Sequence, residues 1–345
     1  VSGSLLQLKS GAVASETFLE SGGTEVVSSG GVDIAGRIFS GGVQTISAGS
    51  ALSGTISAGG QVVVLSGGKA TAETISSGGL ELVQAGGFAA LGRVSSGGVL
   101  RVSSGGAASG AVVRLGGIET VAAGGTATAT HLFGKEFVFG RTSHTSVGSG
   151  GREFVAAGGA AVGAVVSKGG TLLVSAGGAV SGGLTLSGGN AVISGTMAAG
   201  QAVKFAGSGV LELDNLPGFA AKISGLSAPA EKIDLGGFAF GAGETRTWTQ
   251  SGGSGTLVVR DGGKTATLTL IGAYATSDFH LANDGHGGTY VADHGPAPAT
   301  PSRLAQAAAV LGGVLSDRGG GASHRPIAPA THGSQQPLPA VSAGR

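Results

Sequence analysis

The chain contains no cysteine, and its aromatic and charged residues are scarce. Without cysteine there can be no disulfide, no zinc ribbon and no cysteine nucleophile. The absence also suits a protein that crosses an oxidising periplasm. Only 4% of the residues are aromatic and 11% are charged, so a core has to be built from Val, Ile, Leu and Ala. With 9 prolines the chain is neither collagen-like nor proline-rich.

Long apolar runs and basic runs are absent as well. No stretch approaches the ~18 apolar residues of a membrane helix, so we expect no membrane-spanning segment in this chain. The net charge is +1 and no basic cluster is present, which gives no sign of a nucleic-acid-binding surface. No signal peptide is visible. Because the chain begins with Val1 and its only methionine is Met197, we interpret it as a fragment of a longer protein.

Glycine is in large excess, with 72 of 345 residues. Gly-Gly pairs recur at spacings that alternate between 8 and 11 residues, which gives a repeat of 19 residues. Repeats start at positions 3, 22, 41, 59, 78, 97, 116, 133, 150, 169 and 188. The intervals on either side of position 133 are shorter than a full repeat. The repeat that begins at Phe133 is therefore a worn copy, in which Gly134 aligns with Gly151.

Two aliphatic columns emerge when the copies are aligned. Five residues after each start stands a branched aliphatic residue, as in Val27, Ile46 and Val64. Three residues before the later starts, eight of ten positions are aliphatic and the other two are Thr130 and Thr185. Two columns per repeat predict two short strands per repeat, each closed by a glycine turn.

Such short strands cannot bury their apolar faces alone, so we predict that successive repeats stack into a coil. Backbone groups then pair between coils as in a parallel sheet, at a spacing of ~4.8 Å, and parallel crossovers are right-handed by strong preference. The expected fold class is all-β: a right-handed parallel β-helix, or solenoid, of about ten turns over residues 1–200. The position four after each start is also often apolar. A bend or an apolar outer face would accommodate it, because neighbouring residues of a strand point to opposite sides.

Two further segments follow the repeats. Residues 201–294 are more polar, and residues 255–268 predict a β-hairpin with a glycine turn. We expect this segment to be an all-β C-terminal cap, since the last coil of a solenoid leaves an apolar end to be covered. Residues 295–345 hold seven of the nine prolines and are expected to form a flexible, disordered tail, apart from a short helix at 303–315.

The repeats resemble the passenger repeats of AIDA-type autotransporter adhesins, as segments 21–31 and 150–155 show. The resemblance covers about residues 1–200. It implies a location at the bacterial cell surface or outside the cell, and roles in adhesion, autoaggregation or biofilm formation. The partners it implies are cell-surface glycans or proteins, or further copies of the chain.

Some relatives carry heptose on Ser or Thr of these repeats. The resemblance therefore marks the serines that precede Gly-Gly pairs as candidate glycosylation sites, and the alternative is ordinary turn chemistry, in which the hydroxyl bonds nearby backbone. These serines are Ser21, Ser29, Ser40, Ser66, Ser77, Ser96 and Ser104.

Two other functions stay open: a secreted β-helix enzyme acting on polysaccharide, and a passive spacer whose binding is confined to the cap. The enzyme would need clustered carboxylates in a groove. Glu119, Glu136 and Glu153 do share one column in three successive repeats. We interpret them as an outward, solvated ladder whose charge Lys135 and Arg152 offset, and we expect no catalytic residue.

We also expect no cofactor. The glycine turns lack the aspartates of calcium-binding β-rolls. In the cap, the candidate ligands for a cation are Asp278, Asp284 and Asp293.

Overall fold

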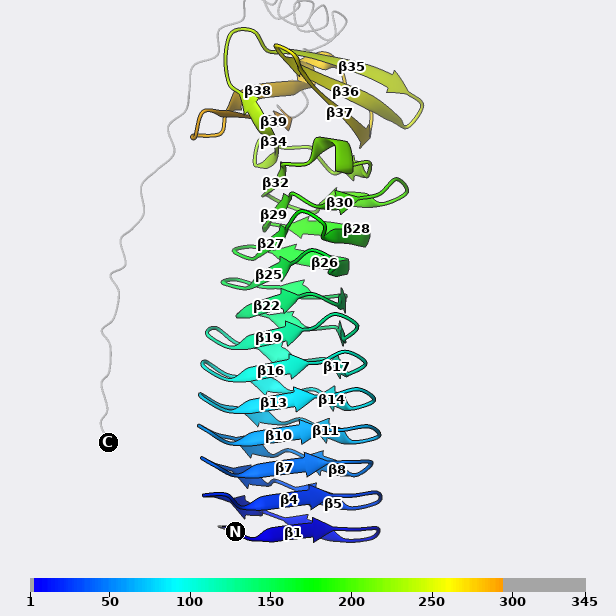
Figure 1. Ribbon diagram of the computed structural model, residues 1–345. Coiled ribbons are helices and arrows are strands. Elements are labelled where there is room, and N and C mark those ends of the chain that lie inside the picture. Colours follow the sequence, from blue (N-terminus) through cyan, green and yellow to red (C-terminus); the bar gives the residue numbers. More distant parts are fainter. Residues whose placement is uncertain (1–2, 294–345) are drawn as a thin grey trace, which may run out of the picture. The chain divides into compact units, whose positions relative to one another are not determined.

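The computed structural model describes residues 3–293, and the tail and short helix expected at 295–345 lie outside them. The described residues form a parallel β-solenoid of about twelve coils with antiparallel strands at its C-terminal end (Figure 1). The predicted fold class is confirmed. Within the described residues, no helix is long and apolar enough to cross a membrane.

One wall of the solenoid is a continuous ladder of parallel strands, one from each coil (Figure 1). In order these strands are β1 (Leu5–Leu8), β4 (Thr24–Val27), β7 (Val43–Ile46), β10 (Gln61–Val64), β13 (Leu80–Val83), β16 (Val99–Val102), β19 (Ile118–Val121), β22 (Lys135–Val138), β25 (Arg152–Val155), β27 (Thr171–Val174), β29 (Asn190–Ile193), β32 (Gly209–Leu213) and β34 (Glu231–Ala239). We call it the long wall.

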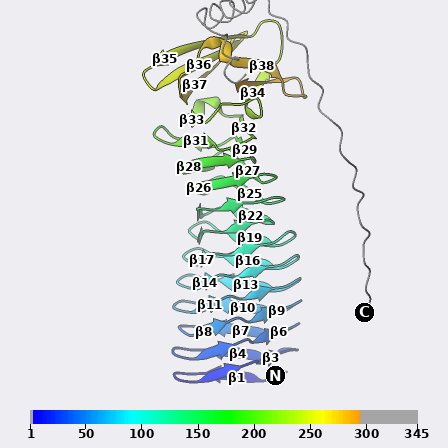
Figure 2. The same cartoon turned by 180° about the vertical axis from the view of Figure 1, so that it is seen from behind.

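Shorter strands form the other two walls of each coil (Figure 2). The second wall contains β2 (Val13–Ser15), β5 (Val32–Ile34), β8 (Ser50–Leu52), β11 (Lys69–Thr71), β14 (Phe88–Ala90), β17 (Ala107–Ser109), β20 (Thr126–Thr128) and β23 (Arg141–Ser143). The third contains β3 (Phe18–Leu19), β6 (Arg37–Ile38), β9 (Thr55–Ile56), β12 (Thr74–Ile75), β15 (Arg93–Val94), β18 (Val112–Val113), β21 (His131–Leu132) and β24 (Ser146–Val147). In later coils the two walls merge into β26 (Ala160–Ser167) and β28 (Ala179–Ser187), or are formed by β30 (Thr196–Met197), β31 (Ala202–Phe205) and β33 (Lys222–Ser224).

The aliphatic columns predicted from the repeat line the interior. Val27 pairs with Ile46 and Ile46 with Val64, and all three side chains are fully buried. The second column is also interior, but Leu132 and Leu186 occupy it in place of Thr130 and Thr185. Loop lengths change near these repeats, so counting back from the next start misplaced them.

The solenoid has about two more coils than the ten expected. The regular spacing of the Gly-Gly pairs ends at position 189, yet Ile193 pairs with Leu213 and Leu213 with Leu235, all of them buried. Aliphatic residues therefore continue the interior column after the glycine pattern has ended.

Both glycines of a corner pair are needed, for different reasons. Gly59 has a φ of +77°, in the left-handed region where side chains are strained. Gly60 has an ordinary φ, but a Cβ there would lie 2.4 Å from the carbonyl oxygen of Ile38 in the preceding coil. One glycine makes the turn, and the other lets consecutive coils approach.

The antiparallel strands after the last coil are β35 (Thr245–Ser251), β36 (Ser254–Asp261), β37 (Lys264–Ile271), β38 (Phe279–Asn283) and β39 (Gly288–Asp293), with short 3-10 turns at Leu216–Gly218 and Thr276–Asp278. β37 pairs with β33, and β39 pairs with β34, so these strands continue the sheets of the solenoid. The β36–β37 hairpin is the one expected at 255–268. Below, the cap means residues 201–293, which comprise the last coils of the solenoid and the antiparallel strands that follow them.

Candidate functional site

The worn repeat is a coil with two shortened corners, and we call it the short coil (residues 133–147). Val113 pairs with Leu132, a full repeat further along the chain, whereas Ile118 pairs with Lys135, which comes two positions too early for a full repeat. Two residues are therefore missing at the corner between them. Thr126 pairs with Arg141, which comes four positions too early for a full repeat. The first corner accounts for two of these positions, so a second deletion of two residues lies at the next corner.

Each shortened corner replaces a glycine-pair turn with Phe-Gly. Phe133 and Gly134 form the first corner, and Phe139 and Gly140 form the second. Both rings point outward, with 42% of Phe133 and 46% of Phe139 exposed. The two corners flank β22, one at each end of the strand. The shortening therefore leaves a notch in the rod on either side of the long wall.

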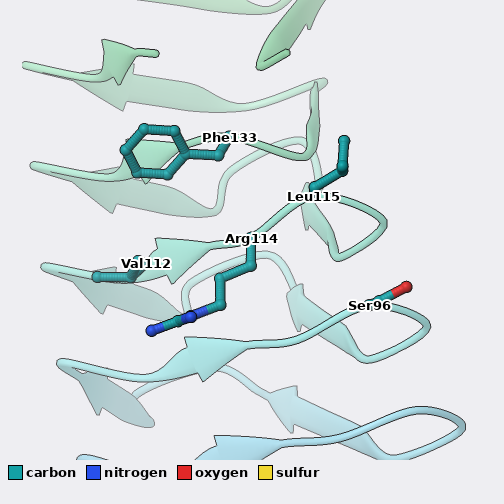
Figure 3. A pocket seen from close by; sticks show the side chains of 5 residues that line it. All are labelled: Ser96, Val112, Arg114, Leu115 and Phe133. Atoms are coloured by element: carbon teal, nitrogen blue, oxygen red, sulfur yellow. The ribbon is translucent and has the colours of Figure 1, made fainter. Parts of the chain in front are cut away.

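The first notch is a cavity of about 580 Å³ beside Phe133, which we call the Phe133 cavity. Figure 3 shows the Arg114 side chain one coil below Phe133 and close to Val112. Leu115 and Ser96, on the turns of the preceding coils, complete the lining. The cavity thus combines three apolar side chains with one guanidinium and one hydroxyl.

The second notch, the Phe139 cavity, has a volume of about 290 Å³. It too combines an exposed phenylalanine with an arginine, here Arg141. Backbone and small side chains form the rest of its lining.

The outer face between the two notches is aromatic and basic. Lys135 lies directly opposite Arg152 on β25, and both are exposed. Phe137 and Phe154 stack with their ring centroids 5.1 Å apart and an interplanar angle of 13°. These rings occupy the apolar position that the sequence left unexplained, and they lie on the outer face of the wall.

The glutamate column is buried inside the solenoid, which corrects the expectation of a solvated ladder. Glu119, Glu136 and Glu153 stack in register on β19, β22 and β25, each with no exposed surface. Lys135 and Arg152 point to the opposite side of these strands and remain exposed, so they do not pair with the buried carboxyls.

Threonines from the other walls supply the hydrogen bonds. Thr142 Oγ1 donates to Glu153 Oε1 at 2.7 Å, and Thr130 Oγ1 donates to Glu119 Oε2 at 3.2 Å. The second oxygen of each carboxyl has no partner among the described residues. An ionised carboxylate with an unpartnered oxygen is costly in such a place, so these groups are stable there in the protonated form.

Burial is the main reason why the pKa values of these glutamates are raised. It raises the pKa of Glu81 to about 8 and that of Glu119 and Glu153 to about 7. It also raises the pKa of Glu136 well above its ordinary value, and the neighbouring Glu119 and Glu153 raise it further.

A second buried polar group lies near the N-terminal end. Gln44 Nε2 donates to Glu25 Oε2 at 2.9 Å and to Asp33 Oδ2 at 2.7 Å. Burial raises the pKa of Glu25 to about 7 despite these bonds, and it raises the pKa of Glu73 to about 7 as well. No Lys, Arg or His is buried in the described part of the solenoid.

The alternation of side chains between the two faces of a strand would have indicated that these glutamates are buried. The glutamates stand three residues after each repeat start, two residues from the invariant aliphatic column, so both positions point to the same side of the strand. The same column holds Val62, Leu100 and Leu172 in other coils, all buried. These aliphatic members mark the column as interior.

Burial of the acids leaves a basic exterior. Across residues 21–200, all of which the structure describes, no carboxylate is exposed, because all seven acidic side chains are buried. All nine Lys and Arg side chains of this segment are exposed: Arg37, Lys69, Arg93, Arg101, Arg114, Lys135, Arg141, Arg152 and Lys168. The formal charge of +1 hides this separation.

The seven serines predicted as glycosylation sites are all exposed at glycine corners. They divide between two corners of the coil. Ser21, Ser40, Ser77 and Ser96 precede the long wall, and Ser29, Ser66 and Ser104 follow it.

The three aspartates predicted as cation ligands do not form one site. Asp278 and Asp293 line a cavity of about 260 Å³ with Tyr274. Asp284 lies in a separate turn, where its Oδ1 accepts from the backbone N–H of His286 and Gly288. Among the described residues, no group of three or more His, Asp or Glu is arranged to hold a metal ion.

Comparison with solved structures relates the chain to a known passenger fragment. No protein-family model and no curated protein matches the chain. Among solved structures, it is 34% identical to a TibA fragment (residues 55–350) hyper-glycosylated by TibC, and the match covers 62% of this chain and 85% of that one. The identity and coverage carry the relationship together with the 19-residue repeat, and the superposition, at a TM-score of 0.49, adds nothing to it. The chain belongs to the AIDA-type autotransporter adhesin passengers.

Proposed function

We propose that this chain is a surface-displayed or secreted adhesive rod that acts in adhesion, autoaggregation or biofilm formation. The observation that carries the proposal is the long wall, which presents an outward strand face in each of about twelve coils. Many weak contacts along such a surface add up to strong attachment without any single tight site.

The Phe133 and Phe139 cavities contain no carboxylate among the described residues that line them. A glycan-hydrolysing site would need two carboxyl groups on either side of the scissile bond. Seven of the nine carboxyl groups in residues 3–200 are buried instead. This arrangement favours the adhesive rod over the enzyme.

The function can be tested with beads coated with the full chain. We expect coated beads to clump with one another or to attach to cells, and beads coated with an unrelated protein to do neither. Coated beads that stay dispersed and bind no cells would contradict the proposal.

A variant separates the adhesive rod from a passive spacer with a binding cap. Arg260→Gln with Asp284→Asn changes exposed or partly exposed side chains that lie after the last coil. If the rod wall adheres, beads coated with this variant clump like wild type. Loss of clumping would assign the adhesion to the cap.

We also propose that the seven exposed corner serines are glycosylated. Their exposure, and the hyper-glycosylated state of the TibA fragment, support this. Intact-mass measurement of protein from its native host should give several masses spaced by one sugar. Ser77→Ala should remove one site, whereas Ser76→Ala, at a half-buried neighbour, should remove none. A single unmodified mass would contradict the proposal.

A further inference from the structure

We propose that the short coil is a binding site for an acidic oligosaccharide, with sugar rings seated in the Phe133 and Phe139 cavities and their acidic groups bound by Arg114 and Arg141. The inference rests on the proposed adhesive function and names the ligand class of one site on the rod. It is carried by the two notches, by the side chains that line them and by the charge of the wall around them.

The notches are specific to this coil. Regular corners carry a four-residue turn around the glycine pair, and consecutive turns stack closely, so that a Cβ on Gly59 would lie 2.9 Å from Ser40 Oγ. At the short coil both long-wall corners lose two residues, and an exposed ring stands where the turn would be. Volumes of about 580 and 290 Å³ are in the range that holds one to a few sugar rings.

The lining matches the two faces of a sugar. A pyranose ring has an apolar C–H face, which packs against an aromatic ring, and Phe133 with Val112 and Leu115 offers such a surface. Its polar edge needs hydrogen-bond donors. Among the described residues, Arg114 is the one charged residue that lines the first cavity, and Arg141 is the one that lines the second, so these two side chains would supply the donors.

Charge selects an acidic sugar over a neutral one. A guanidinium binds carboxylate or sulfate through two parallel hydrogen bonds. Lys135 and Arg152 lie on the outer face between the cavities, and residues 21–200, described throughout, expose no carboxylate that would repel an anion. A polyanion that follows the long wall from one notch to the other meets cations and aromatic rings but no exposed carboxylate.

Single-stranded nucleic acid fits these observations less well. Its binding sites present successive open aromatic faces along a groove. Here Phe133 and Phe139 lie at opposite corners of the wall, and the rings between them, Phe137 and Phe154, are stacked on each other. Nucleic acid is therefore an outcome for the test to separate.

Binding is measured with the full chain by fluorescence anisotropy, using a labelled heparin hexasaccharide and a labelled oligogalacturonate, at 50 and 300 mM salt. Unlabelled neutral dextran and a single-stranded DNA of matched charge serve as competitors. We expect at least one acidic oligosaccharide to bind, dextran not to compete, and the DNA to compete at least tenfold less well. Equal competition by the DNA would replace the saccharide site with a general polyanion surface and overturn the proposal.

Matched charge variants locate the site. Arg114→Gln with Arg141→Gln should weaken binding at least tenfold. Arg37→Gln with Arg93→Gln removes the same charge from exposed positions elsewhere on the rod and should weaken it less than twofold. Equal losses in both pairs would mean diffuse attraction without a site, which contradicts the proposal.

Two further variants test the chemistry. Phe133→Ala should weaken binding at least threefold, and the loss should persist at 300 mM salt, because stacking is not screened. Phe88→Ala, at an exposed ring outside the short coil, is its control and should have no effect. Arg114→Lys keeps the positive charge but removes the planar guanidinium that donates two parallel hydrogen bonds. Binding equal to wild type would show that no such bidentate contact is made.

The bead assay separates this inference from the proposed function. Beads that clump or attach to cells while the chain binds neither acidic oligosaccharide contradict the inference and leave the adhesive function standing. Beads that do neither contradict the adhesive function, whatever the chain binds in solution.

Discussion

The repeats of residues 3–200 and the segment 201–293 contain the same number of acidic residues but bury them to very different extents. In residues 3–200, seven of nine carboxyl groups are buried, whereas in residues 201–293 seven of nine are exposed or half-buried. The buried cap acids are Glu231 and Asp293. The same residue type therefore serves as an interior group in one segment and as a surface charge in the other. In the second segment Asp214, Glu244 and Asp284 lie in turns outside the strands, whereas the glutamates of the long wall stand at inward strand positions.

Register buries the glutamates of the long wall because one position along a strand moves a side chain from one face to the other. Glu136 and Lys135 are neighbours in sequence, yet one is fully buried and the other exposed. A narrow coil without buried cations favours the neutral form of a buried carboxyl over its charged form. The two regions should consequently respond differently to pH.

The largest expected effect is a loss of rod stability as the pH rises from 5 to 9. In the unfolded chain a glutamate ionises near pH 4.5, while folded Glu81 keeps its proton up to a pKa of about 8. Between these values the folded state binds more protons, so the free energy of unfolding falls with rising pH. For Glu81 alone the difference corresponds to about 5 kcal/mol.

Melting followed by far-UV circular dichroism should show this loss as a lower Tm, by roughly 10–20 °C for a change of that size. Fluorescence of Trp248, the only tryptophan of the chain, reports the cap, whose unfolding should shift less. A Tm that is constant or rises between pH 5 and 9 would contradict the buried, protonated column.

The next effect in size comes from a neutral replacement inside the rod. Glu81→Gln cannot ionise, so at pH 9 the variant should be more stable than wild type by about 3 kcal/mol, after the ~1–3 kcal/mol cost of an unpaired amide. Gln44 already occupies the same column in an earlier coil. At pH 5 the gain should vanish.

The matched control is Glu212→Gln in the cap, where the side chain is half-buried. Its stability should differ from wild type much less at both pH values. A similar gain in both variants at pH 9 would mean that net charge, and not burial, governs the response.

The smallest effect concerns the corners. Gly60→Ala adds a Cβ 2.4 Å from a backbone carbonyl of the neighbouring coil and should destabilise the rod by about 2 kcal/mol. Gly263→Ala, in the β36–β37 turn of the cap, meets nothing within 4 Å and should be nearly neutral. Chemical denaturation of the two variants checks the difference, and equal stabilities would refute the close approach of the coils.

The repeat was enough to predict the solenoid, because the aliphatic column of Val27, Ile46 and Val64 is regular and strand periodicity is simple. The glutamate ladder was misassigned because charged residues are usually exposed, and that general preference outweighed the alternation along β22. The notches could not be predicted. The worn repeat was recognised from Gly134, but how its corners close depends on contacts between coils.

The separation of charge also affects how the folded protein migrates in an electric field. Counting residues gives +1 at pH 7, but the interior glutamates keep part of their protons at that pH, so the native molecule carries more positive charge than its composition implies. Native isoelectric focusing should therefore place the folded chain at a more basic position than the urea-denatured chain. The distance between the two bands measures how many carboxyl groups the coil has neutralised by enclosing them.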